Sequence, residues 1–433
     1  MPPKPAKLPE IFFDLRKGNY WVKIPQGRYL PLDGRKVKIH LMKAGMDVRV
    51  EDSIGLKTGD AVLYKAETER WVDFAGPIAG KKCGAVEIAG GRRVLVTSEH
   101  EKIIPKRGKF PRLEAFLDDL FAPDPAQLDY VLYWLKLAHQ SLESGRFRPG
   151  HLLAMVGPPG CGKSFMHILI TALLGGRSEK PYAFMTGETP FNAELAGAEH
   201  LIIEDEAAQS NFAARRKFGQ QIKNWTTDEF LKVTTKGVTG ITLSFFRRLS
   251  LSVNWEPENV QVLPPMDDSI KGRIMLFKCG AVDKNGDTIH PPLSEDRDKN
   301  TKMLNDELPA LLHYLQRLKI PKHMEEPRYG VKAYHNKEIL EVLSGLSAET
   351  RLAEFIDQII FGGNDAPEFW RGSATELEKE LAQSAFRFQV EKLLPNAVSC
   401  GTFLSRLAKQ NPERYVKKLS EGRTVWLIIK GKK

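Results

Sequence analysis

The chain has 433 residues, of which 42% are hydrophobic and 27% charged, an ordinary balance for a soluble protein of two or three domains. It has no run of about eighteen apolar residues and no apolar stretch near its N-terminus, so we expect neither a membrane span nor a signal peptide. Lys and Arg number 64 against 54 Asp and Glu, and this excess of +10 suits a polyanionic partner without requiring one.

The cysteines are widely spaced, and no two of them form a CxxC pair. This spacing argues against a zinc site and against a disulfide framework. It favours a reducing compartment, and we expect a cytoplasmic protein. The four cysteines are Cys83, Cys161, Cys279 and Cys400.

Residues 1–106 alternate apolar and polar side chains between Gly-rich turns. Residues 20–24 and 93–97 show the period of two that is typical of strands, so we expect a small β-rich N-terminal domain. The domain has no acidic triad with a histidine of the kind that a metal-dependent primase, an enzyme that starts new nucleic-acid strands, uses. If the protein acts together with a primase, that activity would therefore come from a separate partner protein.

Residues 107–148 carry leucines and aromatic residues at helical spacing, which predicts a helical collar. Four short apolar runs then alternate with helical patterns. Such runs are typical of buried parallel strands, so we expect an α/β domain over residues 149–320. The runs are residues 152–156, 201–203, 249–253 and 274–277.

A glycine-rich loop follows the first apolar run. It reads G-x-x-x-x-G-K-S and precedes a helical pattern, which is the strand–loop–helix context that a phosphate-binding loop requires. Its glycines let backbone N–H groups surround phosphate oxygens. We expect Lys163 to reach the β- and γ-phosphates of ATP and Ser164 to ligate Mg²⁺. The predicted ATP-binding residues are Gly157, Pro158, Pro159, Gly160, Cys161, Gly162, Lys163, Ser164, Phe165 and Asp205.

Three acidic residues follow the second apolar run, at the strand end where open α/β sheets bind ligands. We assign Asp205 to the Mg²⁺ shell and Glu206 to polarising the attacking water. Glu204 is the alternative if the register shifts by one residue, although we expect it to be a solvated charge.

Together these motifs resemble those of the AAA+ ATPases, and within them the superfamily 3 helicases, above all phage and poxvirus-type primase-helicases. The match spans residues 111–318. It implies an AAA+ parallel-sheet core with the helical collar before it. It also implies hexamers that travel 3′ to 5′ on single-stranded DNA.

Two further segments add to the resemblance. Residues 249–257 resemble the sensor-1 strand, which implies that Asn254 orients the lytic water. Residues 268–277 resemble the segment carrying the arginine finger, which implies that Arg273 enters the neighbouring subunit's ATP site; Lys271 is the nearby alternative. The implied catalytic residues are therefore Lys163, Glu206, Asn254 and Arg273.

Residues 229–237 resemble the hairpin that superfamily 3 helicases project into a central channel. Gly237 and Gly240 are turn signals, and a lysine there can pair with a phosphate as a point charge. We expect Lys236 to contact DNA, with Lys232 as the second choice.

The C-terminal part begins with a linker helix over residues 321–346. Residues 347–433 show three helices and a hairpin, with a capping box at 373–376, and resemble a winged helix. A basic helix and wing fit duplex DNA, and a protein-docking domain with a solvated basic face fits almost as well. The basic residues are Arg406, Lys409, Lys417 and Lys418, with Arg414 and Arg423.

The leading hypothesis is therefore an ATP- and Mg²⁺-dependent DNA helicase, ring-forming and hexameric, that acts on single-stranded and forked DNA in replication of a phage, virus or mobile element. The alternatives are an AAA+ origin-binding or loader switch without processive unwinding, and the ATPase of an antiviral assembly.

Overall fold

The computed structural model describes residues 9–51, 55–204, 212–260, 262–264, 266–280, 288–291, 293–345, 348–363, 366–394, 398–420 and 423–431. The chain divides into two compact units, Met1–Asn336 and Lys337–Lys433, each described here by itself. Across the described ranges, no helix has both the length and the apolar character needed to cross a bilayer.

The N-terminal region contains a sheet in the order β3-β2-β1-β4, with β1 Ile11–Asp14, β2 Asn19–Lys23, β3 Tyr29–Leu32 and β4 Trp71–Val72. It also contains two helices, α1 Gly34–Lys43 and α2 Thr58–Glu69, so the prediction of a β-rich domain was incomplete. Helix α1 buries only Val37 and Leu41, a stripe too narrow to give a clear helical period in the sequence.

A second small sheet connects this region to the rest of the unit. Its order is β5-β7-β6, with β5 Phe74–Gly76, β6 Gly84–Ile88 and β7 Arg92–Val96. The backbone that follows β5 is tied to the central domain, because Ala79 N donates to Ala196 O at 2.8 Å and Gly80 N donates to Glu199 Oε1 at 2.9 Å. Glu199 is fully buried and also accepts from Arg177 Nε at 2.8 Å.

The central domain is built on a five-stranded sheet in the order β14-β8-β13-β10-β9, and every neighbouring pair is parallel. Four of its strands confirm the predicted apolar runs. The fifth, β9, has two exposed polar residues and left no apolar signal. The strands are β8 Leu152–Val156, β9 Ser178–Glu179, β10 His200–Glu204, β13 Arg248–Val253 and β14 Ile274–Lys278.

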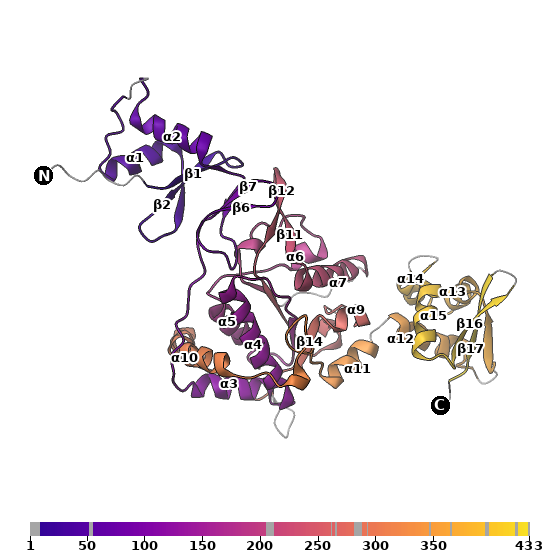
Figure 1. The fold of residues 1–433 in the computed structure, drawn as a ribbon. Helices are drawn as coiled ribbons and strands as arrows, with labels where there is room; N and C mark the ends of the chain where they lie inside the picture. The colour runs from indigo at the N-terminus through magenta and orange to yellow at the C-terminus, as the bar shows by residue number, and fades with distance from the viewer. Residues whose placement is uncertain are drawn as a thin grey trace. The chain divides into compact units, whose positions relative to one another are not determined.

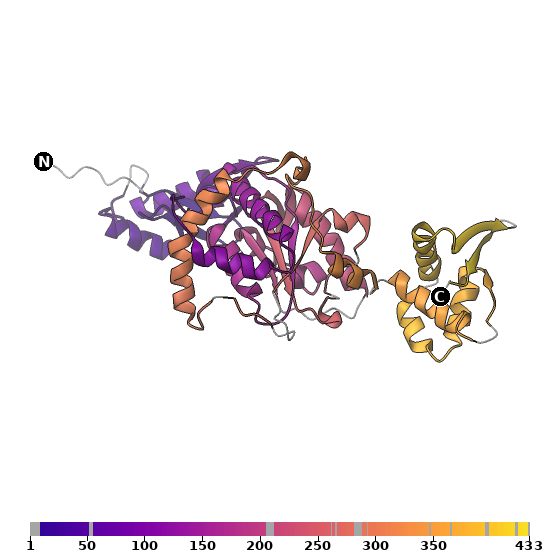
Figure 2. The same ribbon diagram turned by 90° about the horizontal axis from the view of Figure 1, so that it is seen from below.

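Helices cover this sheet. Helices α3 and α4 are the predicted collar, and α10 lies alongside them (Figure 1). The turned view in Figure 2 shows the same association. The Arg112 guanidinium on α3 pairs with Glu307 on α10 at 2.8 Å, and the Gln127 side chain on α4 bonds both backbone groups of Lys278. The helices are α3 Pro111–Phe121, α4 Ala126–Ser144, α5 Lys163–Leu173, α6 Tyr182–Thr186, α7 Phe212–Thr227, α8 Pro257–Val260, α9 Asp268–Lys271 and α10 Arg297–Arg317, with 3-10 turns η1 Leu195–Gly197 and η2 Lys322–Met324.

The predicted hairpin is present between β10 and β13. Strands β11 Phe230–Thr235 and β12 Val238–Ser244 pair antiparallel, and Lys236 and Gly237 form the turn. Gly237 has φ +73°, a conformation that favours glycine. Asn192 holds the hairpin: its Nδ2 donates to Lys232 O at 2.9 Å, and its Oδ1 accepts from Thr234 N at 2.7 Å.

The C-terminal unit contains helices and a three-stranded antiparallel sheet in the order β15-β17-β16. It begins with α11 at Lys337, ten residues before the predicted boundary at 347. The capping box of Ser373 and Glu376 and the closing hairpin are confirmed, whereas β15 and α14 were not predicted. The elements are α11 Lys337–Gly345, α12 Ala348–Phe355, the π-helical turn η3 Ile356–Ile360, β15 Phe369–Gly372, α13 Ala374–Ala382, α14 Arg387–Leu393, α15 Ser399–Gln410, β16 Tyr415–Ser420 and β17 Arg423–Ile429.

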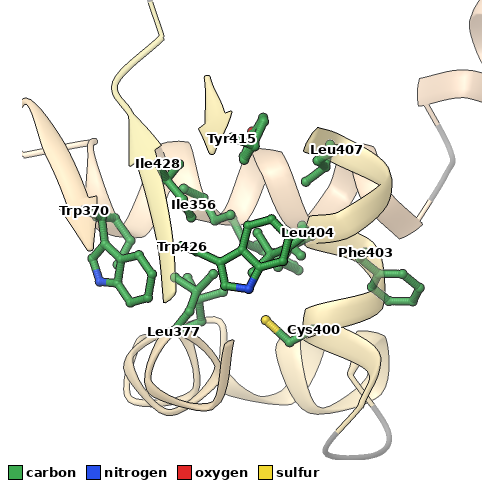
Figure 3. Close-up of a cluster of buried hydrophobic side chains, with 14 of the residues drawn as sticks. Ile356, Trp370, Leu377, Cys400, Phe403, Leu404, Leu407, Tyr415, Trp426 and Ile428 are labelled. Atoms are coloured by element: carbon green, nitrogen blue, oxygen red, sulfur yellow. The ribbon is translucent and has the colours of Figure 1, made fainter. Parts of the chain in front are cut away.

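Trp426 lies at the centre of this unit's core and is 2% exposed (Figure 3). Replacing it by alanine, Trp426→Ala, should destabilise the C-terminal unit by about 3–5 kcal/mol, because the lost contacts and the cavity both cost free energy. Differential scanning calorimetry of the full chain should show a lowered transition for that unit alone. The control is Phe388→Ala, which removes an aromatic ring that is 77% exposed and should change little. Equal effects of the two variants would contradict this core.

Candidate functional site

The predicted phosphate-binding loop connects the buried strand β8 to helix α5. Gly160 and Gly162 have φ of +76° and +102°, in the region that only glycine adopts without strain. Gly157 is required for a different reason: a Cβ there would lie 2.2 Å from Cys279 O. The loop therefore needs glycine at three of its positions, two for backbone conformation and one for close packing.

Helix α5 begins directly after the loop, with Gly162 at the N-cap and no side chain capping it. Its first intrahelical bond runs from Met166 N to Gly162 O, so the N–H groups before Met166 have no acceptor within the helix. Phe116 from α3 packs on Phe165 with ring centroids 4.9 Å apart, which fixes the collar against the start of α5. This helix start offers an anion site backed by apolar packing.

Lys163 is buried beneath the loop and its Nζ donates to four acceptors, the longest contact being that to Cys161 Sγ at 3.9 Å. Its Nζ donates to Gly157 O at 2.8 Å, to Pro158 O at 2.7 Å and to Asn254 Oδ1 at 3.1 Å. Asn254 follows β13, which pairs with β8, so the strand predicted as sensor 1 neighbours the strand of the phosphate-binding loop. The structure thus brings Lys163 and Asn254 together from positions 91 residues apart.

Ser164 contacts the acidic strand end. Its hydroxyl donates to a carboxylate oxygen of Glu204, the last residue of β10. We had expected Glu204 to be a solvated charge at the strand end; it is partly exposed there, and its carboxylate also reaches the loop through Ser164. Asp205 and Glu206, assigned to Mg²⁺ and to water, lie outside the described residues.

The two cysteines near Lys163 are neutral thiols. Burial raises the pKa of Cys161, and burial raises the pKa of Cys279 well above its ordinary value. Neither thiol is therefore a nucleophile at neutral pH. The charged groups of the site are Lys163 and Glu204.

These residues fit a nucleoside triphosphate with Mg²⁺. The loop leaves no room for a Cβ at Gly157, and the first N–H groups of α5 face outward from the helix start. The buried Lys163 ammonium lies beside the loop, where it can bind phosphate oxygens. The Ser164 hydroxyl and the Glu204 carboxylate are oxygen donors of the kind that Mg²⁺ prefers. Pro159 lies in the same loop.

Arg273 lies at the other end of the sheet. Its backbone O accepts from Leu152 N, at the beginning of β8, whereas the phosphate-binding loop follows the end of β8. Five residues of strand, about 16 Å, separate the two ends. Arg273 Nη1 donates to Ser269 O, and Lys271 is exposed at the end of α9. Neither residue lies at the candidate nucleotide site of its own chain.

The lysines predicted to contact DNA are exposed on the hairpin. Lys236 is in the turn. Lys232 is on β11 and lies opposite Thr242 on β12. Because side chains alternate along a strand, Lys232 shares one face with Phe230, which is 60% exposed, while Val233 points to the other face and is buried.

The basic residues of the C-terminal unit differ in their availability. Arg406 pairs with Glu349, whose side chain is 8% exposed, and Arg414 pairs with Asp357. Arg406 is exposed on α15, as expected for a residue that faces out from this helix, and it is also engaged in an ion pair. Lys409, Lys417 and Lys418 are exposed too, with Lys417 Nζ 5.9 Å from the centroid of the Trp426 ring. The side chain of Arg423 lies outside the described residues.

Two contributors to the site were not found from the sequence. Phe116 was seen only as one of several apolar collar positions, and no local signal tells which of them meets Phe165. Asn192 lies in a segment without periodicity, and its role appears only where it bonds the hairpin backbone.

The close packing at Gly157 predicts the effect of one methyl group. Gly157→Ala should reduce stability by about 1–3 kcal/mol, because the Cβ would clash with the Cys279 backbone, which cannot rotate away. It should also abolish the rise in melting temperature caused by a non-hydrolysable ATP analogue with Mg²⁺. In the control Gly272→Ala the new Cβ meets nothing within 4 Å, and the protection should persist. Normal protection of Gly157→Ala by the analogue would argue against this site.

Comparison with known proteins finds solved structures of similar fold and a family model of unknown function. No curated protein sequence matches the chain. Residues 155–269, which include the whole candidate phosphate-binding loop, the acidic strand end and the hairpin, match the model of DUF5906, a family of unknown function. The A form apo structure of the NrS-1 C terminal region has a TM-score of 0.55 at 14% identity, covering 98% of this chain and 97% of that one. A second apo structure of the same region has a TM-score of 0.56 at 14% identity and covers 98% and 96%. At this identity the likeness shows a shared fold alone.

Proposed function

We propose that the protein is a P-loop ATPase of AAA+ type that works as a superfamily 3 DNA helicase in replication of a phage, virus or mobile element. The observation that carries the proposal is the meeting of Lys163, Ser164, Asn254 and Glu204 at the carboxyl ends of three parallel strands. The fold shared with the NrS-1 C terminal region over nearly the whole chain is compatible with this proposal.

The geometry suggests how the loop would act. Triphosphate oxygens compete with Gly157 O, Pro158 O and Asn254 Oδ1 for the Lys163 ammonium, and an anion is the stronger acceptor. When Lys163 turns to the phosphates, the Asn254 amide is released to orient water. Mg²⁺ would be held by Ser164 with Glu204 or Asp205, and it would neutralise phosphate charge. Glu206 remains our proposal for polarising the water.

The placement of Arg273 supports an oligomer. Because it lies at the end of the sheet away from its own loop, it can approach a triphosphate only on a second copy of the chain. A ring closes such head-to-tail contacts, and a hexamer is the size that the family resemblance implies. The collar helices α3 and α4 would lie between subunits.

The hairpin would be the part that moves DNA. Its Lys236 is an exposed cation at the turn, and Asn192 fixes the base of the hairpin to the central domain. A rigid base transmits displacement of the domain to the turn. We propose that Lys236, with Lys232 behind it, contacts backbone phosphates of a single strand.

A loader or origin-binding switch is less well supported. Under this alternative, the C-terminal unit would act as a winged helix and would be the main contact with duplex DNA. Two of its arginines, Arg406 and Arg414, are engaged in ion pairs with Glu349 and Asp357. Breaking these pairs would oppose DNA binding.

A mixing experiment tests the contribution of Arg273 to a neighbouring site. Lys163→Ala and Arg273→Ala should each lose ATPase activity by about 10³-fold or more. Mixed and reassembled in equal amounts, they should regain about a quarter of the wild-type rate, because one site in four would join an intact loop to an intact arginine. Phosphate release measures the rate.

The control for that experiment is Lys271→Ala, which should keep near-normal activity alone. If the mixture stayed as inactive as its components, Arg273 would not act across subunits. If Lys271→Ala were inactive and Arg273→Ala active, the two roles would have to be exchanged.

The hairpin predicts a separation of two activities. Lys236→Ala should retain basal ATPase activity, since the turn lies outside the nucleotide site, and should lose stimulation by single-stranded DNA together with unwinding of a forked duplex. Lys180→Ala, an exposed lysine outside the hairpin, is the matched control. Unwinding at the normal rate by Lys236→Ala would exclude the hairpin as the DNA-moving element.

A further inference from the structure

The positive charge of the chain is concentrated in one region. Residues 1–106 contain 20 Lys and Arg against 13 Asp and Glu, a net charge of +7 out of +10 for the whole chain. Residues 337–433, which include the proposed winged helix, contain 15 against 13, a net charge of only +2. Clustered positive charge is the electrostatic mark of nucleic-acid binding, so the N-terminal region is the stronger candidate for a polyanion.

A cavity of about 610 Å³ lies between this region and the central domain, within the size range of ligand sites. One wall is formed by Asp14 at the end of β1, by Arg16 and Lys17 in the turn after it, and by β5 with Pro77. The facing wall is formed by residues 176–179, Ala193, Glu194, Gly197 and Ala198. Strands β5 and β9 are both edge strands of their sheets, so an extended chain can enter between them.

The N-terminal wall of the cavity is cationic. Lys17 is exposed, and Arg16 is half-buried with its Cζ 5.8 Å from the centroid of the Phe74 ring. Arg16 Nη1 is buried and has no hydrogen-bond acceptor among the described residues. The Asp14 carboxylate is 1% exposed and accepts from the backbone N–H of Arg16 at 2.9 Å, so it is turned to the backbone.

The facing wall carries the opposite charge and adjoins the hairpin. Glu179 and Glu194 line it and are exposed, whereas Arg177 is neutralised by Glu199. Thr235 also lines the cavity and precedes Lys236 in the hairpin turn. A phosphate backbone would therefore follow the N-terminal wall of a cavity whose lining also includes Thr235, the residue before the proposed DNA contact at Lys236.

We infer that this cavity holds a segment of single-stranded nucleic acid, whose phosphates contact Lys17 and Arg16, so that the N-terminal region grips the strand next to the hairpin. This inference rests on the proposed function, because it needs a strand at the hairpin. It assigns to residues 1–106 a role in holding DNA, and it places the second DNA contact of the chain there in preference to the C-terminal unit.

The test measures binding of a fluorescent oligothymidine to the full chain by anisotropy at several salt concentrations. Lys17→Glu should weaken binding about fivefold to tenfold at low salt and reduce the slope of log K against log salt by about 0.7 or more. Arg16→Gln should act in the same direction, and Glu194→Gln should strengthen binding. The matched control is Lys43→Glu, the same charge change at an exposed position on α1, away from the cavity, which should alter neither quantity.

Crosslinking gives a second readout. A photoreactive benzoylphenylalanine in place of Lys17 should couple to the oligonucleotide, and the same group in place of Lys43 should not. If wild-type binds the oligonucleotide while Lys17→Glu and Lys43→Glu have equal affinity and slope, the inference is overturned and the proposed function stands. If wild-type binds no single-stranded DNA and shows no stimulation by it, both are overturned.

Discussion

The parallel pairing of β8 with β13 determines where the other groups of the proposed nucleotide site lie. Parallel strands deliver their carboxyl ends to one edge of a sheet, and here that edge receives the phosphate-binding loop, Asn254 and Glu204. Antiparallel pairing of either strand would send one of these groups to the far edge, about 16 Å away. The same rule puts Arg273, at the beginning of β14, beyond the reach of its own loop.

Buried polar contacts hold the loop helix on the sheet. Ser250 Oγ on β13 lies 2.6 Å from His167 Nδ1 on α5 and 2.7 Å from His200 Nε2 on β10, so one hydroxyl joins three elements. Burial lowers the pKa of His200 well below its ordinary value, and the ring is therefore neutral near pH 7. The shared Ser250 hydroxyl thus helps to keep α5, with its candidate anion site, on the sheet.

Buried side chains connect the N-terminal region and the hairpin to the central domain, in addition to backbone bonds such as Ala79 N to Ala196 O and Asn192 N to Thr234 O. Glu199 joins Gly80 to Arg177, and Asn192 joins the segment before η1 to β11. Each is buried and bonded to backbone, so its loss would leave polar groups without partners. In both cases the bonded residues lie in loops beside the central sheet. The proposed DNA-holding parts are therefore fixed to the same domain as the proposed nucleotide site.

The sequence alone determined the local features whose signals are short in range. The strand–loop–helix motif, four apolar strands, the collar helices, the hairpin with Gly237 and the capping box at Ser373 all follow from periodicity, glycine conformation and capping, and all are present. What only the tertiary structure decided depends on contacts between distant residues. The bond of Lys163 to Asn254, the turn of Glu204 toward Ser164, the pairing of Arg406 with Glu349 and the cavity beside Lys17 each join segments that no local pattern relates. The physical reason is that the contact partner of a side chain depends on strand order and packing. The residues next to it in the sequence indicate only whether that segment prefers helix, strand or turn.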